Sequence, residues 1–345
     1  MRILFVINSP EAKFPRDLAL ETNRRKDIDL RLFNLLDTGK KSKDFLFRLR
    51  FILSLPSLLF HLRREIRTFQ PDVVHSNFWL SDVVVRLATY GMGGLRLIST
   101  QHDEAELPFF IRLVKRWALK RFDKVCAISK SVASFLTDYL AVPEEKVVLV
   151  YNGIEIDDFA GAQKSRGAWG PVLGTFARLE RIKGVDLLIL ALAGLENPPE
   201  TYIVGDGAEK RELILKSKKI ERLAKQIHFV GHQKDIVAYL KKVDVVVVPS
   251  RSEGLGNIIL EAMAAKKLVL AAKTGGISEL VEDGKTGLLF ERNDISSVEK
   301  TIEWVVSNKD KSLEIAEAGG AWLDKNRELF DLDKTIEKYL KIYAE

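Results

Sequence analysis

The chain has 345 residues, of which 46% are hydrophobic and 30% charged, and it contains one cysteine. This length predicts two compact domains with room for a cleft, and the composition excludes a fibrous, low-complexity or disordered protein. The single cysteine, Cys126, excludes a disulfide framework and a thiolate metal site, so a reducing compartment is expected.

The formal net charge of +6 is unevenly distributed. Residues 1–150 contain 25 Lys and Arg against 17 Asp and Glu, a balance of +8, whereas residues 151–345 contain 29 against 31, a balance of −2. A basic half of this kind indicates an acidic substrate, an anionic membrane surface or nucleic acid. Nucleic acid is the least favoured, because no zinc finger, RNA-binding aromatic signature or Arg-rich tail accompanies the charge.

The first residues form the strand-like run Arg2–Ile7 and lack the charged region, spacer and small-residue cleavage site of a secretory signal. We therefore expect a cytoplasmic protein. Short β-branched runs then alternate with longer amphipathic segments, and the runs are nearly continuous in apolar character. This pattern predicts parallel strands covered by helices on both faces, in two Rossmann-like α/β domains. The expected strands are Ile3–Ile7, Val73–His75, Leu97–Gln101, Lys124–Ile128, Val147–Tyr151, Val172–Ala177, Tyr202–Gly205, Ile227–Gly231, Val243–Pro249 and Leu268–Ala272.

Phe and Leu side chains cluster between Lys40 and Arg67, flanked by Lys and Arg. No uninterrupted apolar stretch reaches the roughly 20 residues of a membrane span, and Pro56 interrupts it. Two interpretations stay open: a basic amphipathic segment lying on an anionic leaflet, or a pair of core-packed helices with a solvated basic face, which the sequence slightly favours. A second basic and aromatic stretch, Phe109–Phe122, adds to the membrane interpretation.

Turn-forming residues mark a boundary between the two domains, near residues 152–158 and 161–167. We place an N-terminal domain at residues 1–155 and a C-terminal domain at 156–325. Residues 326–345 are expected to form a C-terminal helix that packs back toward the N-terminal domain.

The strand expected at Val172–Ala177 is followed by Arg178, and Lys183 lies five residues further on at an expected helix start. Two cations at the end of a strand suit a diphosphate, because Arg can contact two oxygens and Lys supplies a mobile charge, to which a helix N-terminus adds its dipole. By themselves the two residues could equally be surface cations.

The most informative stretch runs from Ser250 to Glu261. Gly254 and Gly256 allow the backbone to approach a ligand closely. Glu253 and Glu261 are eight residues apart, about two helical turns, so both can face one groove if a helix begins near Leu255. The alternative for Glu261 is a first-turn glutamate that complements the helix dipole.

With these motifs, the chain resembles the family 4 retaining glycosyltransferases, whose GT-B fold consists of two Rossmann-like doubly wound domains facing across a cleft. The resemblance is strong from Val147 to Phe290 and looser before it. It rests on Val150-Tyr-Asn-Gly-Ile154, Arg178 with Lys183-Gly184, Gly205-Asp-Gly207, Glu253-Gly-Leu-Gly with Glu261, and Gly275-Gly276 with Glu279.

The resemblance implies that residues 1–155 bind the acceptor and that residues 156–325 bind the nucleotide-sugar donor. Arg178 and Lys183 would hold the donor diphosphate, and Glu261 the ribose hydroxyls. The transferred sugar would be bound by Glu253 with the backbone of Gly254, Leu255, Gly256 and Asn257. In the family, the turn at Gly205, Asp206 and Gly207 lines the nucleotide site, although a plain strand-end turn is an equally good interpretation of Asp206 itself.

In the N-terminal half, Gln101-His102-Asp103 resembles the family's His-Asp step, whose histidine contacts the transferred sugar. His102 and Glu253 are thus the catalytic candidates, and His75 is expected to be a buried strand-end residue. The family's glycine-rich first loop is missing, because residues 8–16 contain no glycine and two prolines, which hinders close backbone approach. Ser9, Lys13 and Arg16 are the candidates on the acceptor side.

No tightly bound metal or cofactor is expected. Gly284-Lys-Thr286 lacks the earlier glycine of a P-loop, and Gly205-Asp-Gly207 lacks the third glycine of a dinucleotide fingerprint. Residues 27–29 and 331–333 each contain an Asp pair but follow no convincing strand.

The sequence therefore predicts a retaining, metal-independent hexosyltransferase. It would move a hexosyl or N-acetylhexosaminyl unit from a UDP-sugar, or second GDP-mannose, to a glycan or lipid-linked acceptor in cell-envelope synthesis. The alternatives are a GT-B sugar-nucleotide epimerase and a non-catalytic scaffold that binds sugar nucleotides. The protein is expected to be cytoplasmic, with peripheral contact at the inner face of the cell membrane.

Overall fold

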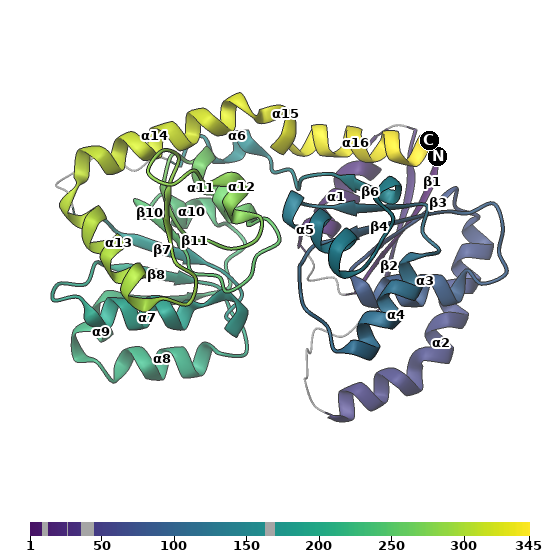
Figure 1. The fold of residues 1–345 in the computed structure, drawn as a ribbon, viewed down its shortest axis with the longest axis horizontal. Coiled ribbons are helices and arrows are strands. Elements are labelled where there is room, and N and C mark those ends of the chain that lie inside the picture. Colours follow the sequence, from purple (N-terminus) through teal and green to yellow (C-terminus); the bar gives the residue numbers. More distant parts are fainter. Residues whose placement is uncertain (9–12, 26, 36–44, 163–169) are drawn as a thin grey trace. The chain divides into compact units, whose positions relative to one another are not determined.

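The computed structural model describes residues 1–8, 13–25, 27–35, 45–162 and 170–345; the side chains of residue 13 and of residues 45–53 lie outside the description. The chain divides into two compact units (Figure 1). Unit 1 contains Met1–Asn152 and Asp333–Glu345, and unit 2 contains Gly153–Leu332.

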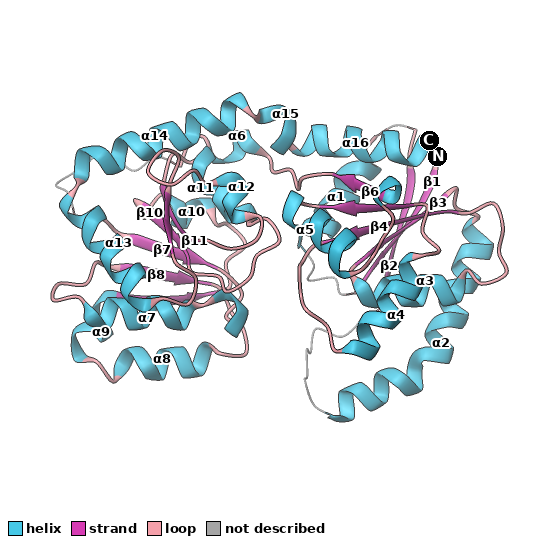
Figure 2. Cartoon of the chain, viewed as in Figure 1, coloured by secondary structure: helices cyan, strands magenta, loops and turns pink. Residues whose placement is uncertain are grey.

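Among its described residues, unit 1 contains a six-stranded parallel sheet in the order β2-β1-β3-β4-β5-β6, flanked by helices (Figure 2). Nearly all of β1, β3 and β4 is buried, because these strands pair on both edges and are covered by helices. The strands are β1 Arg2–Ile7, β2 Asp29–Asn34, β3 Val73–Asn77, β4 Arg96–Gln101, β5 Lys124–Ala127 and β6 Val147–Leu149. The helical segments are α1 Lys13–Asn23, α2 Phe45–Phe69, α3 Trp79–Ala88, α4 Phe109–Leu119, α5 Lys130–Ser134, η1 Phe135–Tyr139 and η2 Glu144–Lys146, with most of α16 Leu332–Ala344.

Unit 2, over the residues that are described, repeats the arrangement with the strand order β12-β11-β10-β7-β8-β9. The strands are β7 Leu173–Phe176, β8 Thr201–Val204, β9 Ile227–Gly231, β10 Val245–Val248, β11 Leu268–Ala272 and β12 Leu288–Phe290. The helical segments are α6 Ile156–Phe159, η3 Arg181–Lys183, α7 Val185–Gly194, α8 Lys210–Lys218, α9 Glu221–Gln226, α10 Val237–Leu240, α11 Asn257–Ala264, α12 Ile277–Leu280, α13 Ile295–Ser307, α14 Lys309–Lys325 and α15 Arg327–Phe330. Its core joins Leu188 of α7, Val245 of β10 and Ile302 of α13, all fully buried. The predicted class, two doubly wound α/β domains, is confirmed.

Two strands were missing from the prediction, β2 and β12, and both lie at sheet edges. In β2 no residue is fully buried, and its sequence alternates polar and apolar residues. The search for continuous apolar runs finds strands covered on both faces, so it passes over an edge strand of this kind.

Helix α2 corrects the expectation of a helix pair between Lys40 and Arg67. It runs as one helix through Pro56, which is exposed and removes one backbone hydrogen bond from the helix interior. Leu62, Ile66 and Phe69 are buried on its inner side. None of the described helices is long and apolar enough to cross a membrane.

Helix α16 is joined to the sheet of unit 1 by a buried polar network. His75 Nδ1 lies 2.5 Å from the hydroxyl of Tyr343, and its Nε2 lies 2.7 Å from Thr100 Oγ1. The Tyr339 hydroxyl is 3.1 Å from the same Thr100 oxygen. Burial lowers the pKa of His75 to about 3, so the ring is neutral at physiological pH. His75 is buried as expected, but it lies in the middle of β3 and not at its end, because the strand continues to Asn77.

Candidate functional site

The predicted motifs of unit 2 follow the carboxyl ends of neighbouring parallel strands. Arg178 follows β7, the turn at residues 205–207 follows β8, the stretch 250–256 follows β10, and residues 274–276 follow β11. Because the carboxyl ends of parallel strands lie at the same edge of a sheet, the fold gathers these segments there, where open α/β sheets bind ligands.

Lys183 and Glu253 form an ion pair at this edge. Lys183 Nζ lies 2.9 Å from Oε1 and 2.7 Å from Oε2 of Glu253, and Ser250 Oγ donates a hydrogen bond of 2.9 Å to Oε2. The side chains are only 19% and 16% exposed, so solvent screens their charges less than at an open surface.

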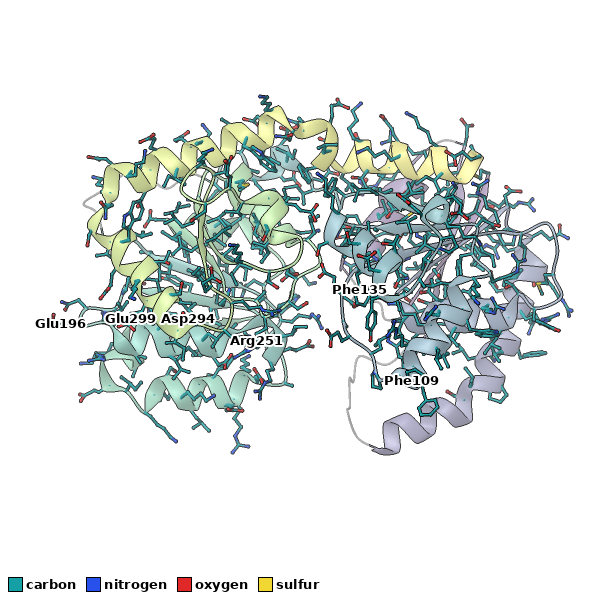
Figure 3. All side chains as sticks on the ribbon, in the orientation of Figure 1. Phe109, Phe135, Glu196, Arg251, Asp294 and Glu299 are labelled. Atoms are coloured by element: carbon teal, nitrogen blue, oxygen red, sulfur yellow. The ribbon has the colours of Figure 1, made fainter. Side chains whose placement is uncertain are left out.

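Arg251, labelled in Figure 3, connects the segment that carries Lys183 to the segment that carries Glu253, and the sequence did not single it out. Its guanidinium binds both carboxylate oxygens of Asp186, at 2.7 and 2.8 Å, and donates to the carbonyl of Arg181 at 2.6 Å. Its backbone N–H donates to the carbonyl of Ile182 at 2.7 Å. The turn η3, which carries Lys183, is thus fixed to the stretch that carries Glu253.

The pairing with Arg251 also affects the charge state of Asp186. Burial alone would raise the pKa of this carboxyl, but the hydrogen bonds and charge of Arg251 hold it below its usual value. Asp186 therefore stays ionised at physiological pH. No local sequence pattern indicates the pair, because 65 residues separate its members.

Arg178 lies beside the turn at residues 205–207. Its side chain is 56% exposed and pairs with Glu180 at 2.8 Å. The backbone N–H of Leu179 donates to the carbonyl of Asp206 at 2.9 Å, so the two segments are hydrogen-bonded neighbours. The structure therefore presents Arg178 as a solvated cation at the same edge as the Lys183–Glu253 pair.

The turn at residues 205–207 is packed closely on the backbone after β7. Gly205 has φ 148°, and a Cβ there would lie 1.8 Å from the carbonyl oxygen of Ala177. Asp206 accepts a hydrogen bond from the Gly207 N–H at 2.8 Å and pairs with Lys210 at 2.6 Å. The hydrogen bond from Lys210 lowers the pKa of Asp206. These contacts give Asp206 a structural role in the turn.

The glycine-rich stretch leads into α11, which begins at Asn257. Gly276 packs on this stretch: its N–H donates to the Glu253 carbonyl at 3.1 Å, and a Cβ would lie 2.1 Å from the carbonyl oxygen of Gly254. Glu261 is 7% exposed and is the fifth residue of α11. The alternative of a first-turn glutamate is therefore wrong, because the first turn of α11 contains no acidic residue even though the helix begins two residues later than expected.

In unit 1, His102 follows β4 and lies between aromatic rings. Its ring centroid is 4.6 Å from that of Phe78 and 6.2 Å from that of Phe14. Its Nε2 lies 3.0 Å from Oδ1 of Asn77, the last residue of β3. Burial lowers the pKa of His102 to about 3, so the imidazole is neutral.

The residues around His102 carry two costly features. Phe78 has φ 72°, a conformation that costs a non-glycine residue about 1–3 kcal/mol. Asn77 is fully buried, and its Nδ2 has no hydrogen-bond partner among the described residues. Features of this kind gather at functional sites, and the sequence did not identify either residue.

The acceptor-side candidates are only partly described. Ser9 lies outside the described residues, as does the side chain of Lys13, the first residue of α1. Arg16, also on α1, pairs with Asp17 at 3.1 Å. Within the described part of the chain, no group of three or more His, Cys, Asp or Glu side chains could hold a metal ion.

Two family models match successive parts of the chain. The model "Glycosyltransferase Family 4" matches residues 24–158, and "Glycosyl transferases group 1" matches residues 163–322. With two doubly wound domains and this edge of unit 2, the chain belongs to the family 4 glycosyltransferases of the GT-B fold.

Individual relatives agree with this class. The chain is 27% identical over 232 residues to an uncharacterized glycosyltransferase, MJ1178, of Methanocaldococcus jannaschii, and 28% identical over 259 residues to a glycogen synthase of Mycobacterium tuberculosis. These matches cover 67% and 70% of this chain, and they span 62% of the length of each relative.

Solved structures share the fold along the whole chain. Anabaena Alr3699/HepE in complex with UDP-glucose has a TM-score of 0.83 at 23% identity, covering 100% of this chain and 99% of that one. Sucrose-phosphate synthase of Thermosynechococcus elongatus has a TM-score of 0.85 at 18% identity, covering 100% and 98%. At these identities the likeness establishes the architecture.

Proposed function

We propose that the protein is a retaining, metal-independent hexosyltransferase. It moves a hexosyl or N-acetylhexosaminyl unit from a nucleotide sugar to a glycan or lipid-linked acceptor in cell-envelope synthesis. Unit 2 binds the donor, and unit 1 binds the acceptor. The observation that carries the proposal is the Lys183–Glu253 pair, which Arg251 fixes among the strand ends of unit 2.

The proposed chemistry begins at the donor's anomeric carbon. Its bond to the diphosphate oxygen breaks, the acceptor hydroxyl oxygen bonds to the same face, and the hydroxyl proton passes to the departing phosphate. Negative charge gathers on the diphosphate as it leaves. Arg178 and Lys183 stabilise that charge and fill the role of a divalent cation.

The remaining roles follow the family motifs. Glu253 and the backbone of residues 254–257 orient the transferred sugar, and Glu261 binds the ribose hydroxyls. His102 is the second catalytic candidate; because it is neutral, it acts by hydrogen bonding and not as a proton carrier. The glycines at 205 and 207 bring the backbone close to the nucleotide, whereas Asp206 maintains the turn.

We favour a UDP-sugar donor, with GDP-mannose second. The support is that the similarly folded Anabaena protein was solved with UDP and with UDP-glucose. A thermal-shift panel of UDP- and GDP-sugars tests this choice, since a ligand at 100 times its Kd stabilises a fold by about 2.7 kcal/mol. A shift with GDP-sugars alone would reverse the order of the two donors.

Turnover separates the proposed function from its alternatives. A transferase consumes donor in proportion to added acceptor, whereas an epimerase converts the donor sugar without acceptor, and a scaffold shows a thermal shift without turnover. Equal rates with EDTA and with added Mg²⁺ are expected. A rate that requires the metal would contradict the proposed role of Arg178 and Lys183.

We also propose that the protein works in the cytoplasm and contacts the inner face of an anionic membrane, where a lipid-linked acceptor is available. The balance of +8 in residues 1–150 supports this partner, because basic surfaces are attracted to anionic lipids.

A further inference from the structure

Helix α4 of unit 1 turns apolar side chains toward solvent. Its exposed large apolar residues follow the spacings i, i+4, i+8 and i+1, i+5, which place them on one side of a helix. We call this set the α4 ridge: Phe109 (66% exposed), Phe110 (79%), Leu113 (42%), Val114 (43%) and Trp117 (41%). Phe109, at the start of α4, can be located in Figure 3.

The rotation of α4 about its axis is fixed by polar contacts on its inner side. Lys115 is 2% exposed and lies near the carboxylates of Asp82 and Asp103. Burial lowers the pKa of Lys115, and the two carboxylates oppose that shift. Arg112 Nε donates to the carbonyl of Tyr139 at 2.9 Å, and the guanidinium lies 4.1 Å from the centroid of that ring.

These contacts determine which side of α4 faces solvent, so the α4 ridge is exposed as a consequence of the fold. Turning the ridge inward would carry Lys115 away from two carboxylates and break the contacts of Arg112 with Tyr139. The fold therefore buries Lys115 of α4 and exposes the aromatic side of the helix to solvent. A contiguous exposed apolar patch of this kind indicates an interaction surface.

Cations lie at the end of the ridge. The guanidinium of Arg86, on α3, lies 4.0 Å from the centroid of the Trp117 ring. Burial lowers the pKa of Arg86, and the positive charge of Arg121 lowers it further. Arg86 thus contacts an aromatic ring, and Arg121 donates to the carbonyl of Met92 at 3.3 Å. An arginine stacked on a tryptophan, with the charge of a second arginine acting on it, is suited to bind a phosphate.

We infer that the α4 ridge, with Arg86 and Arg121, docks on an anionic phospholipid bilayer, an inference that rests on the membrane contact proposed above. The ridge enters the acyl boundary, Trp117 lies at headgroup level, and the arginine pair binds headgroup phosphates. A second copy of this chain is a poorer partner, because residues 109–121 contain five Lys and Arg and no Asp or Glu, so two such helices repel.

This surface lies close along the chain to the candidate site of unit 1. Residues 103–108 connect His102 to the first residue of the ridge, and the hydroxyl of Tyr139 anchors this connection by accepting from the Leu107 N–H at 3.1 Å and donating to its carbonyl at 3.0 Å. Docking through α4 brings the strand edge that carries His102 near the membrane surface, where a lipid-linked acceptor is presented.

Flotation with vesicles tests the inference on the full chain, comparing phosphatidylcholine alone with phosphatidylcholine plus phosphatidylglycerol. Wild type should float with the anionic vesicles. Phe109→Ser and Phe110→Ser should each weaken binding by about tenfold or more, since a buried phenylalanine contributes about 1.5–3 kcal/mol. Arg86→Gln and Arg121→Gln should each weaken it about fivefold. The matched control is Leu215→Ser on α8 of unit 2, also exposed, at 53%.

Two results would overturn the inference. One is a Phe109→Ser/Phe110→Ser double variant that floats like wild type while keeping its melting temperature. The other is gel filtration in which wild type without vesicles elutes as a dimer and the double variant as a monomer, which would assign the ridge to a second copy. Donor-induced thermal shifts and transfer to a soluble acceptor should be unchanged in the double variant. If wild type floats with the anionic vesicles but transfers no sugar, the proposed activity is wrong and the inferred membrane docking stands.

Discussion

Lys183 Nζ contacts both carboxylate oxygens of Glu253, at 2.9 and 2.7 Å, although 70 residues separate the two side chains. Each charge stabilises the other in a setting where solvent screening is reduced. A diphosphate that binds Lys183 competes with Glu253 for the same ammonium group, and this frees the carboxylate to accept hydrogen bonds from sugar hydroxyls. The pair therefore couples the two functions proposed for its members.

The first prediction concerns this pair. Lys183→Ala and Glu253→Ala should each lower the transfer rate by about 100-fold or more, because each removes a group that acts on charge developing in the transition state. Initial rates with saturating donor measure the effect. Lys311→Ala, which removes an exposed ion pair with Glu314, is the control and should transfer at the wild-type rate. Wild-type transfer in both site variants would refute the assignment.

The second prediction concerns Arg251. Arg251→Ala should lower the free energy of unfolding by about 2 kcal/mol, because it leaves Asp186 and the Arg181 carbonyl without their charged donor. It should also raise the donor KM, since η3 and Lys183 lose their attachment. Arg24→Ala, which removes an exposed pair with Glu21, should change unfolding by less than about 1 kcal/mol. Similar urea midpoints for the two variants would contradict the role of Arg251.

The third prediction compares two glycines with positive φ. Gly205→Ala should destabilise unit 2 by about 3 kcal/mol or more, because its Cβ would lie 1.8 Å from a backbone oxygen that cannot move aside. Gly284 has φ 71°, but apart from its chain neighbours no atom lies within 4 Å of an added Cβ, so Gly284→Ala should cost only about 1–2 kcal/mol of backbone strain. The melting temperatures of the two variants measure the difference. A lower melting temperature for Gly284→Ala than for Gly205→Ala would show that the backbone around residue 205 shifts to accept the added Cβ.

The fourth prediction is a pH dependence that comes from His75. Its folded-state pKa of about 3 lies below the ordinary histidine value of 6.5, so between these values the unfolded chain binds a proton that the folded chain does not. Stability from this group is therefore complete above about pH 6.5 and is lost as the pH falls, by up to about 1.4 kcal/mol per pH unit. In urea unfolding between about pH 6 and pH 4, His75→Gln should show a shallower decline than wild type. If the free energy of unfolding falls equally with pH in wild type and in His75→Gln, His75 is not the source of the pH dependence.

The fifth prediction concerns Asn77 and His102. Burial lowers the pKa of His102 to about 3, and its amide partner adds no charge that would oppose this, so the ionisation of His102 should not affect the transfer rate between about pH 5 and pH 8. Asn77→Asp places a carboxylate against Nε2 and should raise the pKa of His102. NMR titration of the histidine rings measures the change, with Asn77→Ala as the variant in which no rise is expected. An unchanged pKa in Asn77→Asp would show that the two side chains are not paired in solution.

The sequence alone determined the fold class and the segments that carry the family's motifs. Continuous apolar runs such as the one before Arg178 predict buried parallel strands, because residues covered on both faces leave a local signal with a fixed period. Since motifs at strand ends share one edge of a sheet, the sequence also predicted that the candidate residues of the C-terminal half lie at one edge. Strand β2 was not predicted, because it lies at the edge of the sheet and pairs with a neighbouring strand on one side only.

The tertiary structure alone decided which side chains meet. The pairs Lys183–Glu253, Arg251–Asp186 and His75–Tyr343 join residues 65 to 268 positions apart, and no periodicity records such distant contacts. The sequence of α4 is basic and aromatic, and it does not indicate which side of the helix faces solvent. The burial of Lys115 near Asp82 shows that the aromatic side is the exposed one. Local patterns depend on neighbours along the chain, whereas charges and rings pair with whatever the fold brings beside them.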